Sequence, residues 1–302
     1  MHIFLTGGTG YVGSAALDAF VHAGYQVDAL VRNSEKAAQV QAHGARPVLG
    51  DVTSQATWVD AAAAADGVVH AAIDYGARGA QVDRAALDGI LGLPARDGRF
   101  VIYTSGVWVL GPAAAPVDER APLNPAEQVS WRPAHEQRVL DASRAGLRAI
   151  VVRPGIVYGG TRGIVGDLFK DAANGLVRVI GTGENHWPLI YDRDLGDLFV
   201  RVAASAKASG IYHANDEGDE RVNDIVAAIA AHAPIRPDVR HVPLAEARSK
   251  IGVYADALAL DQIVRGPRAR ALGWRPTLHS VAGNAARLFE EWRRGREAPV
   301  NR

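Results

Sequence analysis

The strand, glycine loop and helix pattern at the start of the chain constrains the fold most. A short apolar run, HIFLT, meets the glycine-rich stretch GGTGYVG and continues into an amphipathic pattern typical of a helix. Gly7, Gly10 and Gly13 have the spacing G-x-x-G-x-x-G at this turn. A sharp turn with a close backbone approach disfavours side chains at such positions, and the N–H groups that open the helix favour an anion. The stretch therefore predicts a dinucleotide pyrophosphate site.

Further apolar runs follow at regular intervals. They are RPVLGDVT, GVVHAAI, RFVIYTSG and LRAIVVRPG. Strands that alternate with helices of roughly ten to fifteen residues predict an α/β fold with a Rossmann-type doubly wound parallel sheet. From about residue 217 onward helical patterns dominate, which predicts a smaller, mostly helical C-terminal lobe.

The pattern leaves the sheet and returns to it, so we expect two interleaved units. Residues 1–158 and 191–215 form the predicted Rossmann dinucleotide-binding core, and residues 159–190 and 216–302 form a discontinuous substrate-binding lobe. A cleft between two such units is the expected substrate site.

Composition argues against several classes of function. Lys plus Arg equals Asp plus Glu at 33 each, so no net charge points to nucleic acid or a membrane. The chain has no cysteine, which excludes disulfides, thiolate metal ligands and a cysteine nucleophile. The acidic stretch NDEGDE has no histidine at ligand spacing, so we expect no metal. No run approaches membrane-spanning length. We expect a cytoplasmic protein with a small-molecule substrate, no nucleic-acid or membrane partner, and a homodimer as an open alternative.

The end of the second predicted strand indicates which dinucleotide is preferred. An acid at this strand tip holds the ribose 2′-hydroxyl of NAD, whereas an arginine accommodates the 2′-phosphate of NADP. The strand YQVDALV ends at Arg32, and the nearby acid Asp28 lies within the strand. We predict NADP (NADPH) over NAD, with Arg32 as the main contact and Lys36 as a helper. The alternative is that Arg32 is a solvated surface charge.

Several motifs along the chain stand in the order of a known family: TGGTGYVG, GDVT, HAAI, YTSGVWVLG, RPGIVYGG, GTGENHWPLIYDRDLGDLF, GIYHANDEG and RARALGWRPTLHSVAGNAARLFEEW. On these motifs the chain resembles the short-chain dehydrogenase/reductase superfamily, in its extended branch of NAD-dependent epimerase/dehydratase-like proteins. Together with the loop and strand-end predictions, the resemblance implies a set of cofactor-binding residues. They are Gly7, Gly10, Tyr11, Val12, Gly13, Arg32, Asp51, Val52, Ala71, Ala72, Thr104, His135, Pro154, Ile156 and Val157.

The resemblance breaks at the catalytic residues. The family has a Ser or Thr after the fifth strand and a Tyr-x-x-x-Lys pair at the start of the next long helix, with the tyrosine as general acid/base. Gly106, Trp131 and His135 stand at these positions here. Indole is only a donor, so Trp131 offers an apolar wall, whereas imidazole, with a reference pKa of about 6.5, can transfer a proton. We predict His135, Ser105 and Trp131 as catalytic residues, with Ser105 taking the serine role from the adjacent position.

Alternatives remain for these residues. Other candidate proton donors are Tyr103, Tyr158 and Tyr191, although Tyr158 is ordinarily structural in the family. His135 could instead only help to begin a helix. Candidate substrate contacts are mostly aromatic and neutral, which favours a small, rather apolar substrate over a nucleotide sugar, whose diphosphate needs cations. These candidates are Trp108, Trp131, Tyr158, His186, Trp187 and Tyr191.

Three functions of different classes are compatible with the sequence. The leading one is an NADP-dependent oxidoreductase that transfers hydride between NADPH and a carbonyl, imine or activated alkene, with a non-standard proton donor. The second is a redox-neutral epimerase or dehydratase that retains its cofactor. The third is a non-catalytic NADP-binding sensor or scaffold, which an intact glycine loop beside an altered catalytic trio would also predict.

Overall fold

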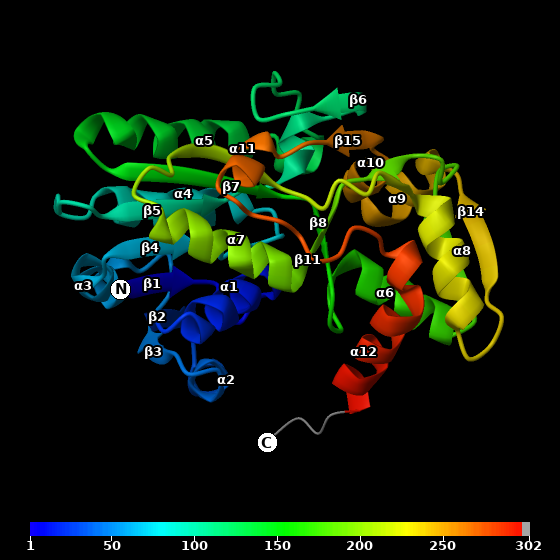
Figure 1. Cartoon of the computed structure of the whole chain (residues 1–302), viewed down its shortest axis with the longest axis horizontal. Coiled ribbons are helices and arrows are strands. Elements are labelled where there is room, and N and C mark those ends of the chain that lie inside the picture. The colour runs from blue at the N-terminus through cyan, green and yellow to red at the C-terminus, as the bar shows by residue number, and fades with distance from the viewer. Residues whose placement is uncertain (298–302) are drawn as a thin grey trace.

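A computed structural model describes residues 1–297 and contains a seven-stranded parallel sheet with helices on both faces (Figure 1). The strand order is β12-β7-β5-β4-β1-β2-β3, so the direction of winding reverses between β1 and β4. This order confirms the predicted doubly wound sheet. In such sheets a ligand is expected beyond the carboxyl ends of the strands where the winding reverses, here β1 and β4. The strands are β1 (His2–Thr6), β2 (Gln26–Val31), β3 (Arg46–Leu49), β4 (Gly67–His70), β5 (Phe100–Thr104), β7 (Arg148–Pro154) and β12 (Gly210–Ala214).

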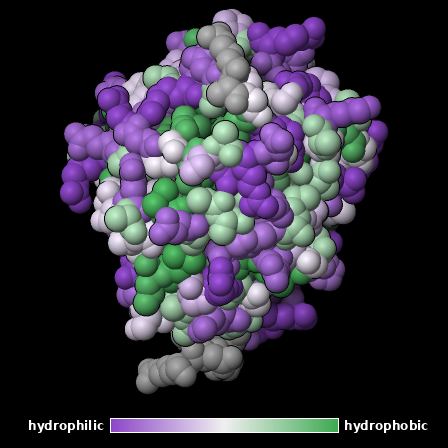
Figure 2. All heavy atoms as spheres, turned by 90° about the vertical axis from the view of Figure 1, so that its left-hand side faces the viewer, coloured by the Kyte–Doolittle hydropathy of each residue, from purple (hydrophilic) through white to green (hydrophobic). Residues whose placement is uncertain are grey.

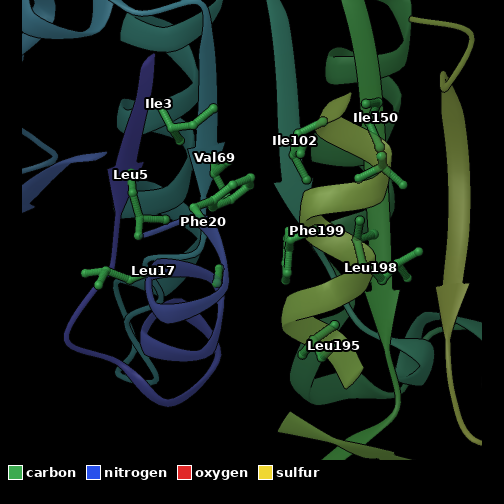
Figure 3. Packing of buried hydrophobic residues seen from close by; sticks show 14 of the residues in the cluster. Ile3, Leu5, Leu17, Phe20, Val69, Ile102, Ile150, Leu195, Leu198 and Phe199 are labelled. Carbon is green, nitrogen blue, oxygen red and sulfur yellow. The ribbon is translucent and has the colours of Figure 1, made fainter. Parts of the chain in front are cut away.

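Side chains of the strands alternate between two hydrophobic layers. Ile3 and Leu5 of β1 pack into one layer, whereas Phe4 packs into the other. Figure 3 shows the first layer, in which helices bring Leu17, Phe20 and Leu198 against the strands. Because both faces are covered, the central strands are mostly apolar rather than strictly alternating with polar residues. The first layer is covered by α1 (Tyr11–His22), α2 (Ser34–Ala42) and α7 (Asp192–Ala204), and the second by α3 (Val59–Ala64), α4 (Gly79–Leu91) and α5 (Arg132–Asp141).

A separate hydrophobic cluster forms the core of the lobe beyond the carboxyl ends of the strands (Figure 1). It joins the segment that follows β7 to helices from the C-terminal third of the chain. The lobe's helices are α6 (Gly163–Ala173), α8 (Val222–His232), α9 (Leu244–Ile251), α10 (Tyr254–Leu258) and α12 (Ala285–Glu297). Paired strands complete it: β8 (Ile156–Tyr158) with β11 (Leu189–Tyr191), β9 (Leu176–Ile180) with β14 (Asp238–Val242), and β10 (His186–Trp187) with β13 (Glu220–Arg221). A further pair, β6 (Ala113–Val117) and β15 (Gln262–Val264), lies beside the carboxyl end of β5.

One C-terminal segment packs on the sheet although the predicted division assigns residues 216–302 to the lobe. Ala269 of α11 (Pro267–Ala271) and Trp274 belong to the hydrophobic layer that α1 and α7 cover. The indole N–H of Trp274 donates to the carbonyl of Asp194 over 2.9 Å, which satisfies its polar atom in the core. The sheet core therefore recruits residues beyond the predicted range, and residues 298–302 lie outside the described part.

The opposite end of the sheet, where the strands begin, has a different surface. A hollow of about 530 Å³ opens there between Met1, Asp66, Arg96 and Arg148. Figure 2 shows this side of the molecule, on which hydrophilic and hydrophobic residues are interspersed. None of the predicted site residues lines this hollow. Within residues 1–297, no helix combines the length and the apolar character needed to cross a membrane.

Candidate active site

The glycine loop has no room for side chains at two of its predicted positions. Gly7 has a φ of +77°, and a Cβ there would lie 2.5 Å from the backbone nitrogen of Ala72. A Cβ on Gly13 would lie 2.0 Å from the carbonyl oxygen of Gly7. Gly10 precedes α1 and gives the helix no side-chain cap, so the first N–H groups of the helix have no partner within it. This cradle fits the pyrophosphate of a dinucleotide.

The next two residues of the loop point their side chains away from that cradle. The Tyr11 hydroxyl donates to the carbonyl of Gly159 over 2.6 Å. Burial, together with the charges of Asp192 and Glu291, raises the pKa of Tyr11. Val12 packs against the hydrophobic layer under α1. Any contact of this pair with the cofactor would therefore come from their backbone N–H groups, at the start of α1.

Arg32 lies directly after β2, at the carboxyl edge of the sheet. It is exposed and makes no side-chain hydrogen bond or ion pair with other residues of the described chain. Asp28 is buried in the same strand, where Arg46 donates to it over 2.7 Å, so it does not serve the strand tip. Asp51 follows β3, and hydrogen bonds from Thr53 lower its pKa, with a smaller contribution from the charge of Arg32.

The rest of this rim is formed by short polar and apolar residues. Ala71 and Ala72 extend β4 beside the glycine loop, where the N–H of Ala71 donates to the carbonyl of Thr6 over 3.2 Å. Val52 lies after β3 and packs partly against the second hydrophobic layer. These residues lie near the carboxyl ends of β3 and β4, and their role as cofactor contacts stays a prediction.

The carboxyl end of β5 has two buried hydroxyl oxygens without a hydrogen-bond partner among the described residues. Thr104 Oγ1 and Ser105 Oγ are buried and have no hydrogen-bond partner within residues 1–297. A buried hydroxyl without a partner is costly, and polar groups of a bound cofactor or substrate would relieve that cost. Pro154 ends β7, and Ile156 and Val157 follow it in β8, which pairs with β11. The residues present therefore fit a dinucleotide with its reactive end near Thr104 and Ser105.

His135 lies in the first turns of α5 and is 3% exposed. Its Nδ1 is 2.6 Å from Oδ2 of Asp83, a carboxylate on α4. The same carboxylate accepts from the Tyr103 hydroxyl at 3.0 Å and contacts Nε2 of His70 at 3.2 Å. His70 Nδ1 in turn is 2.7 Å from the hydroxyl of Thr6. For the other ring nitrogen of His135, Nε2, the structure shows no hydrogen-bond partner among the described residues.

Asp83 is the anionic centre of this group. Burial by itself raises the pKa of a carboxyl. Here hydrogen bonds from His135 and His70, with the charges of His70 and Arg132, outweigh burial and hold the pKa of Asp83 below its ordinary value. Burial and the Asp83 charge raise the pKa of the Tyr103 hydroxyl, so that candidate proton donor stays protonated. Asp83 is therefore an ionised carboxylate in contact with His135.

Trp131 stands immediately before α5 and covers the His135 ring. The two rings meet edge to face with centroids 4.9 Å apart, and the guanidinium of Arg132 lies 4.9 Å from the indole centroid. Arg132 also donates to the carbonyl of Thr104 over 2.8 Å, which ties the start of α5 to the end of β5. The nearby Gly106 has open space, with only the Pro154 carbonyl at 3.8 Å from a Cβ built on it. The structure thus brings Trp131, His135 and the carboxyl end of β5 together.

Several predicted substrate contacts are instead part of the lobe core. Tyr158 is fully buried and donates to Asp216 over 3.1 Å, and Tyr191 is 1% exposed and donates to Glu291 over 3.2 Å. Burial raises the pKa of both, to about 12 for Tyr191. Trp187 is 5% exposed and gives its indole N–H to the carbonyl of Leu258. These three aromatic side chains, which were predicted as substrate contacts, are instead packed in the hydrophobic cluster of the lobe.

The remaining predicted substrate contacts keep accessible surface. His186 is half-buried, with Nδ1 2.8 Å from Asp261. Trp108 is also half-buried and meets Tyr254 edge to face, with centroids 6.0 Å apart. Tyr254 begins α10 and was not predicted, because its neighbourhood carries no motif. Among residues 1–297, no group of three or more His, Asp or Glu residues is placed to hold a metal ion.

Sequence comparisons place the chain in a family. The model of the NAD dependent epimerase/dehydratase family matches residues 3–214. The chain belongs to this family. It is 31% identical over 292 residues to an uncharacterized protein of Schizosaccharomyces pombe, covering 93% of this chain and 96% of that one. The resemblance seen in the motifs is thereby confirmed, and the family name specifies a nicotinamide dinucleotide.

Two relatives have names that describe an enzymatic activity. A 4-hydroxy-2-methyl-3-oxo-4-farnesyl-3,4-dihydroquinoline-1-oxide ketoreductase of Stigmatella aurantiaca is 38% identical over 171 residues, 53% of this chain and 51% of that one. A 2-alkyl-3-oxoalkanoate reductase of Stenotrophomonas maltophilia is 28% identical over 254 residues, 76% of each chain. Both names describe reductases that act on a ketone.

Solved structures share the fold at low identity. The Thermus thermophilus UDP-glucose 4-epimerase, in complex with NAD, superposes with a TM-score of 0.81 at 18% identity and covers 99% of this chain and 100% of that one. A human epimerase family protein with NADPH gives a TM-score of 0.74 at 20% identity, covering 96% and 99%. These structures show the same architecture with either cofactor.

Proposed function

We propose that this chain is an NADPH-dependent reductase of a small, rather apolar carbonyl, imine or activated alkene substrate, with His135 as the proton donor. The observation that carries the proposal is the environment of His135. One ring nitrogen is held by the ionised Asp83, and the other has no partner among the described residues. An imidazole held in this way is positioned to act as a general acid through its other ring nitrogen. Two relatives named as ketone reductases support the same class of reaction.

The chemistry divides between cofactor and protein. When bound, NADPH supplies the hydride for the carbonyl carbon. The N–H groups at the start of α1 bind the pyrophosphate, and Ser105 offers a hydroxyl that orients the carbonyl oxygen. His135 gives its proton to that oxygen, so that a ketone becomes an alcohol and the ring becomes neutral. Trp131 provides an apolar wall that excludes water from the His135 ring.

The first experiment follows NADPH oxidation at 340 nm with 2-alkyl-3-oxo acids and simple ketones. His135→Ala should lower kcat by about 10²–10⁴-fold, the usual contribution of a positioned acid. His43→Ala is a matched control, since His43 also pairs with a carboxylate, Asp18, at 2.6 Å, but on the exposed surface. Equal turnover by the His135 and His43 variants across pH 5–9 would remove His135 from the mechanism.

The preference for NADPH rests on Arg32, which is free at the end of β2. A guanidinium there would pair with the 2′-phosphate, an interaction that NADH cannot make. Arg32→Ala should raise KM for NADPH about tenfold or more, the effect of losing roughly 1.4 kcal/mol, and leave KM for NADH within about twofold. Arg46→Ala is not a suitable control because Arg46 pairs with the buried Asp28. Lys207, an exposed cation with no resolved partner, is the better choice for the control substitution.

The same assay separates two other functions. The replacement of the family's tyrosine and lysine by Trp131 and His135 also fits a non-catalytic NADPH sensor. That function predicts tight NADPH binding without oxidation for every substrate tried. A redox-neutral epimerase or dehydratase predicts conversion of substrate with no net change at 340 nm. The homodimer also stays a proposal, and sedimentation with and without NADPH tests it.

A further inference from the structure

The carboxylate of Asp83 is contacted by donors from three different elements. His135 on α5 and Tyr103 on β5 meet Oδ2, at 2.6 and 3.0 Å, and His70 at the end of β4 meets Oδ1 at 3.2 Å. Asp83 lies on the apolar face of α4, in the same layer as Leu87 and Ile90. A charge in such a place is costly unless it is fully paired. The three contacts explain how the buried charge of Asp83 is tolerated. They also restrict which ring nitrogen of each histidine carries a proton.

An ionised carboxylate only accepts hydrogen bonds, so each histidine must turn an N–H toward it. His135 is therefore protonated at Nδ1, and His70 at Nε2. The remaining nitrogen of a neutral His70, Nδ1, then accepts from the Thr6 hydroxyl, which is 2.7 Å away. The remaining nitrogen of a neutral His135 is Nε2. Proton uptake and release by His135 must take place at that atom.

We infer that Asp83 is a positioning residue that fixes the tautomer and orientation of the His135 ring, so that Nε2 is the atom that faces the substrate. This inference rests on the proposed role of His135 as proton donor. The carboxylate also stabilises the imidazolium that exists before proton transfer, because the positive ring stays in contact with a negative charge.

His70 and Thr6 connect Asp83 to the glycine loop. His70 and Thr6 end neighbouring strands, and Thr6 is followed directly by Gly7. The Thr6 hydroxyl also accepts from the N–H of Ala72, at 3.4 Å. Thr6, His70 and Tyr103 are each at most 1% exposed, so these contacts offer no route for protons to solvent. They fix Asp83 relative to the residues around the glycine loop.

Other charged groups around His135 are already paired. Glu136, the next residue on α5, is buried and forms a two-pronged ion pair with Arg153 of β7, whose Nε donates at 3.0 Å. Arg132, on the same helix, donates to the carbonyl of Thr104 and adds a positive charge near Asp83. Asp83 is therefore the carboxylate in direct contact with His135, and His70 and Tyr103 are the other titratable residues that contact this carboxylate among the described residues.

The first test reads the tautomers directly, by long-range ¹H–¹⁵N NMR of imidazole-labelled wild-type protein above pH 8. We expect His135 to carry its proton on Nδ1 and His70 on Nε2. An Nε2-protonated His135 in the wild-type protein would overturn the inference, and this measurement needs no variant and no substrate. The NMR result does not depend on reductase activity. Failure of the tautomer inference can therefore be distinguished from failure of the proposed reductase function.

The second test is Asp83→Asn, because an amide can accept from one side only and must donate from the other. At least one of His70 and His135 must then change its tautomer. We expect kcat to fall about 10- to 100-fold with KM for NADPH within about threefold, and the alkaline limb of the kcat–pH profile to move to lower pH. Asp88→Asn is the matched control, since Asp88 is also a carboxylate of α4 that pairs with α5, through Arg138 at 2.6 Å, but on the exposed surface.

The third test combines the variants. If Asp83 acts through His135, adding Asp83→Asn to His135→Ala should change kcat by less than about threefold. Full multiplication of the two single effects would overturn the inference, as would wild-type turnover and an unchanged pH profile in Asp83→Asn. Circular dichroism and NADPH binding of each variant establish that it is folded before its kinetics are compared.

Discussion

Two buried carboxylates, one in each half of the molecule, have opposite protonation behaviour. Asp83 in the sheet core and Asp216 in the lobe are 5% and 1% exposed, and each accepts from one tyrosine hydroxyl. The pKa of Asp83 lies below its ordinary value. Burial, with the nearby charge of Glu220, raises the pKa of Asp216 to about 7, although the Gly218 N–H and the Tyr158 hydroxyl both act to lower it.

The difference shows that donors, more than depth, decide whether a buried acid is ionised. Asp83 has two histidines and a nearby arginine in addition to its tyrosine, whereas Asp216 has a tyrosine and one backbone N–H. An ionised carboxylate is useful beside a group that must become positive. Below pH 7 Asp216 is largely neutral, and it then serves as a structural hydrogen-bonding group. Aspartate thus has two roles in this molecule, a charged one at Asp83 and a hydrogen-bonding one at Asp216. Substitution of each residue can tell these roles apart.

The largest expected effect is on stability in Asp83→Asn. Removing the charge leaves donors without a full acceptor, so the free energy of unfolding at pH 7 should fall by about 3 kcal/mol. Because the folded pKa of Asp83 is lowered, its contribution is present above the ordinary carboxyl pKa and is lost as pH falls further. Urea denaturation should show a constant difference in unfolding free energy between wild type and Asp83→Asn from pH 8 to about pH 4. This difference should become smaller between about pH 4 and pH 3. A difference that widens in acid would contradict the assigned charge.

An Asp-to-Asn substitution at Asp216 should change the free energy of unfolding in the opposite direction. Its folded pKa of about 7 lies above the unfolded value, so its stabilising contribution is complete below about pH 4 and is lost as pH rises through 7. Asp216→Asn cannot ionise, and its one amide oxygen can accept from either Tyr158 or the Gly218 N–H but not from both in the present geometry. At pH 8 we expect it to be about 1–3 kcal/mol more stable than wild type, and its stability to be flatter between pH 4 and 8. A less stable variant at pH 8 would show that Asp216 is charged and well paired.

The two tyrosines give the smallest and most closely matched comparison. Tyr103→Phe removes a hydrogen bond to an ionised acceptor and should cost about 1.5–3 kcal/mol, while Tyr158→Phe at pH 5.5 removes one to a neutral acceptor and should cost about 0.5–1.5 kcal/mol. Above pH 8 the cost of Tyr158→Phe should approach that of Tyr103→Phe, because Asp216 is then ionised. Chemical denaturation at both pH values measures the difference, and equal costs at pH 5.5 would undo the comparison.

The cofactor end of the site could be predicted from sequence because its determinants are local. The glycines stand within one turn, and the collisions that a Cβ would cause at Gly7 and Gly13 follow from that turn. Arg32 was predicted from its place at a strand end, where it is found. The family resemblance placed His135 near the start of a long helix, and it lies in the first turns of α5. These inferences needed only short-range patterns.

The partners of His135 could not be predicted, since they come from distant parts of the chain. Asp83 is 52 residues away in sequence. One signal was present: Asp83 falls at helical spacing with Leu87 and Ile90, so an acid stands in an otherwise apolar stripe. The lobe shows the converse difficulty. Tyr158 and Tyr191 were predicted to line a cleft, and their burial depends on α12 and on Asp216, which no local pattern places against them.

The links between Tyr11 and Gly159 and between Arg162 and Thr9 have a kinetic consequence. The Arg162 guanidinium donates to the Thr9 carbonyl over 2.9 Å, so the segment that leads into the lobe is fastened to the glycine loop at two points. Under the proposed reductase function, a dinucleotide bound at the loop would lie beside the start of that segment. We would then expect ordered addition, with the cofactor entering first and leaving last, and product inhibition patterns would test this order.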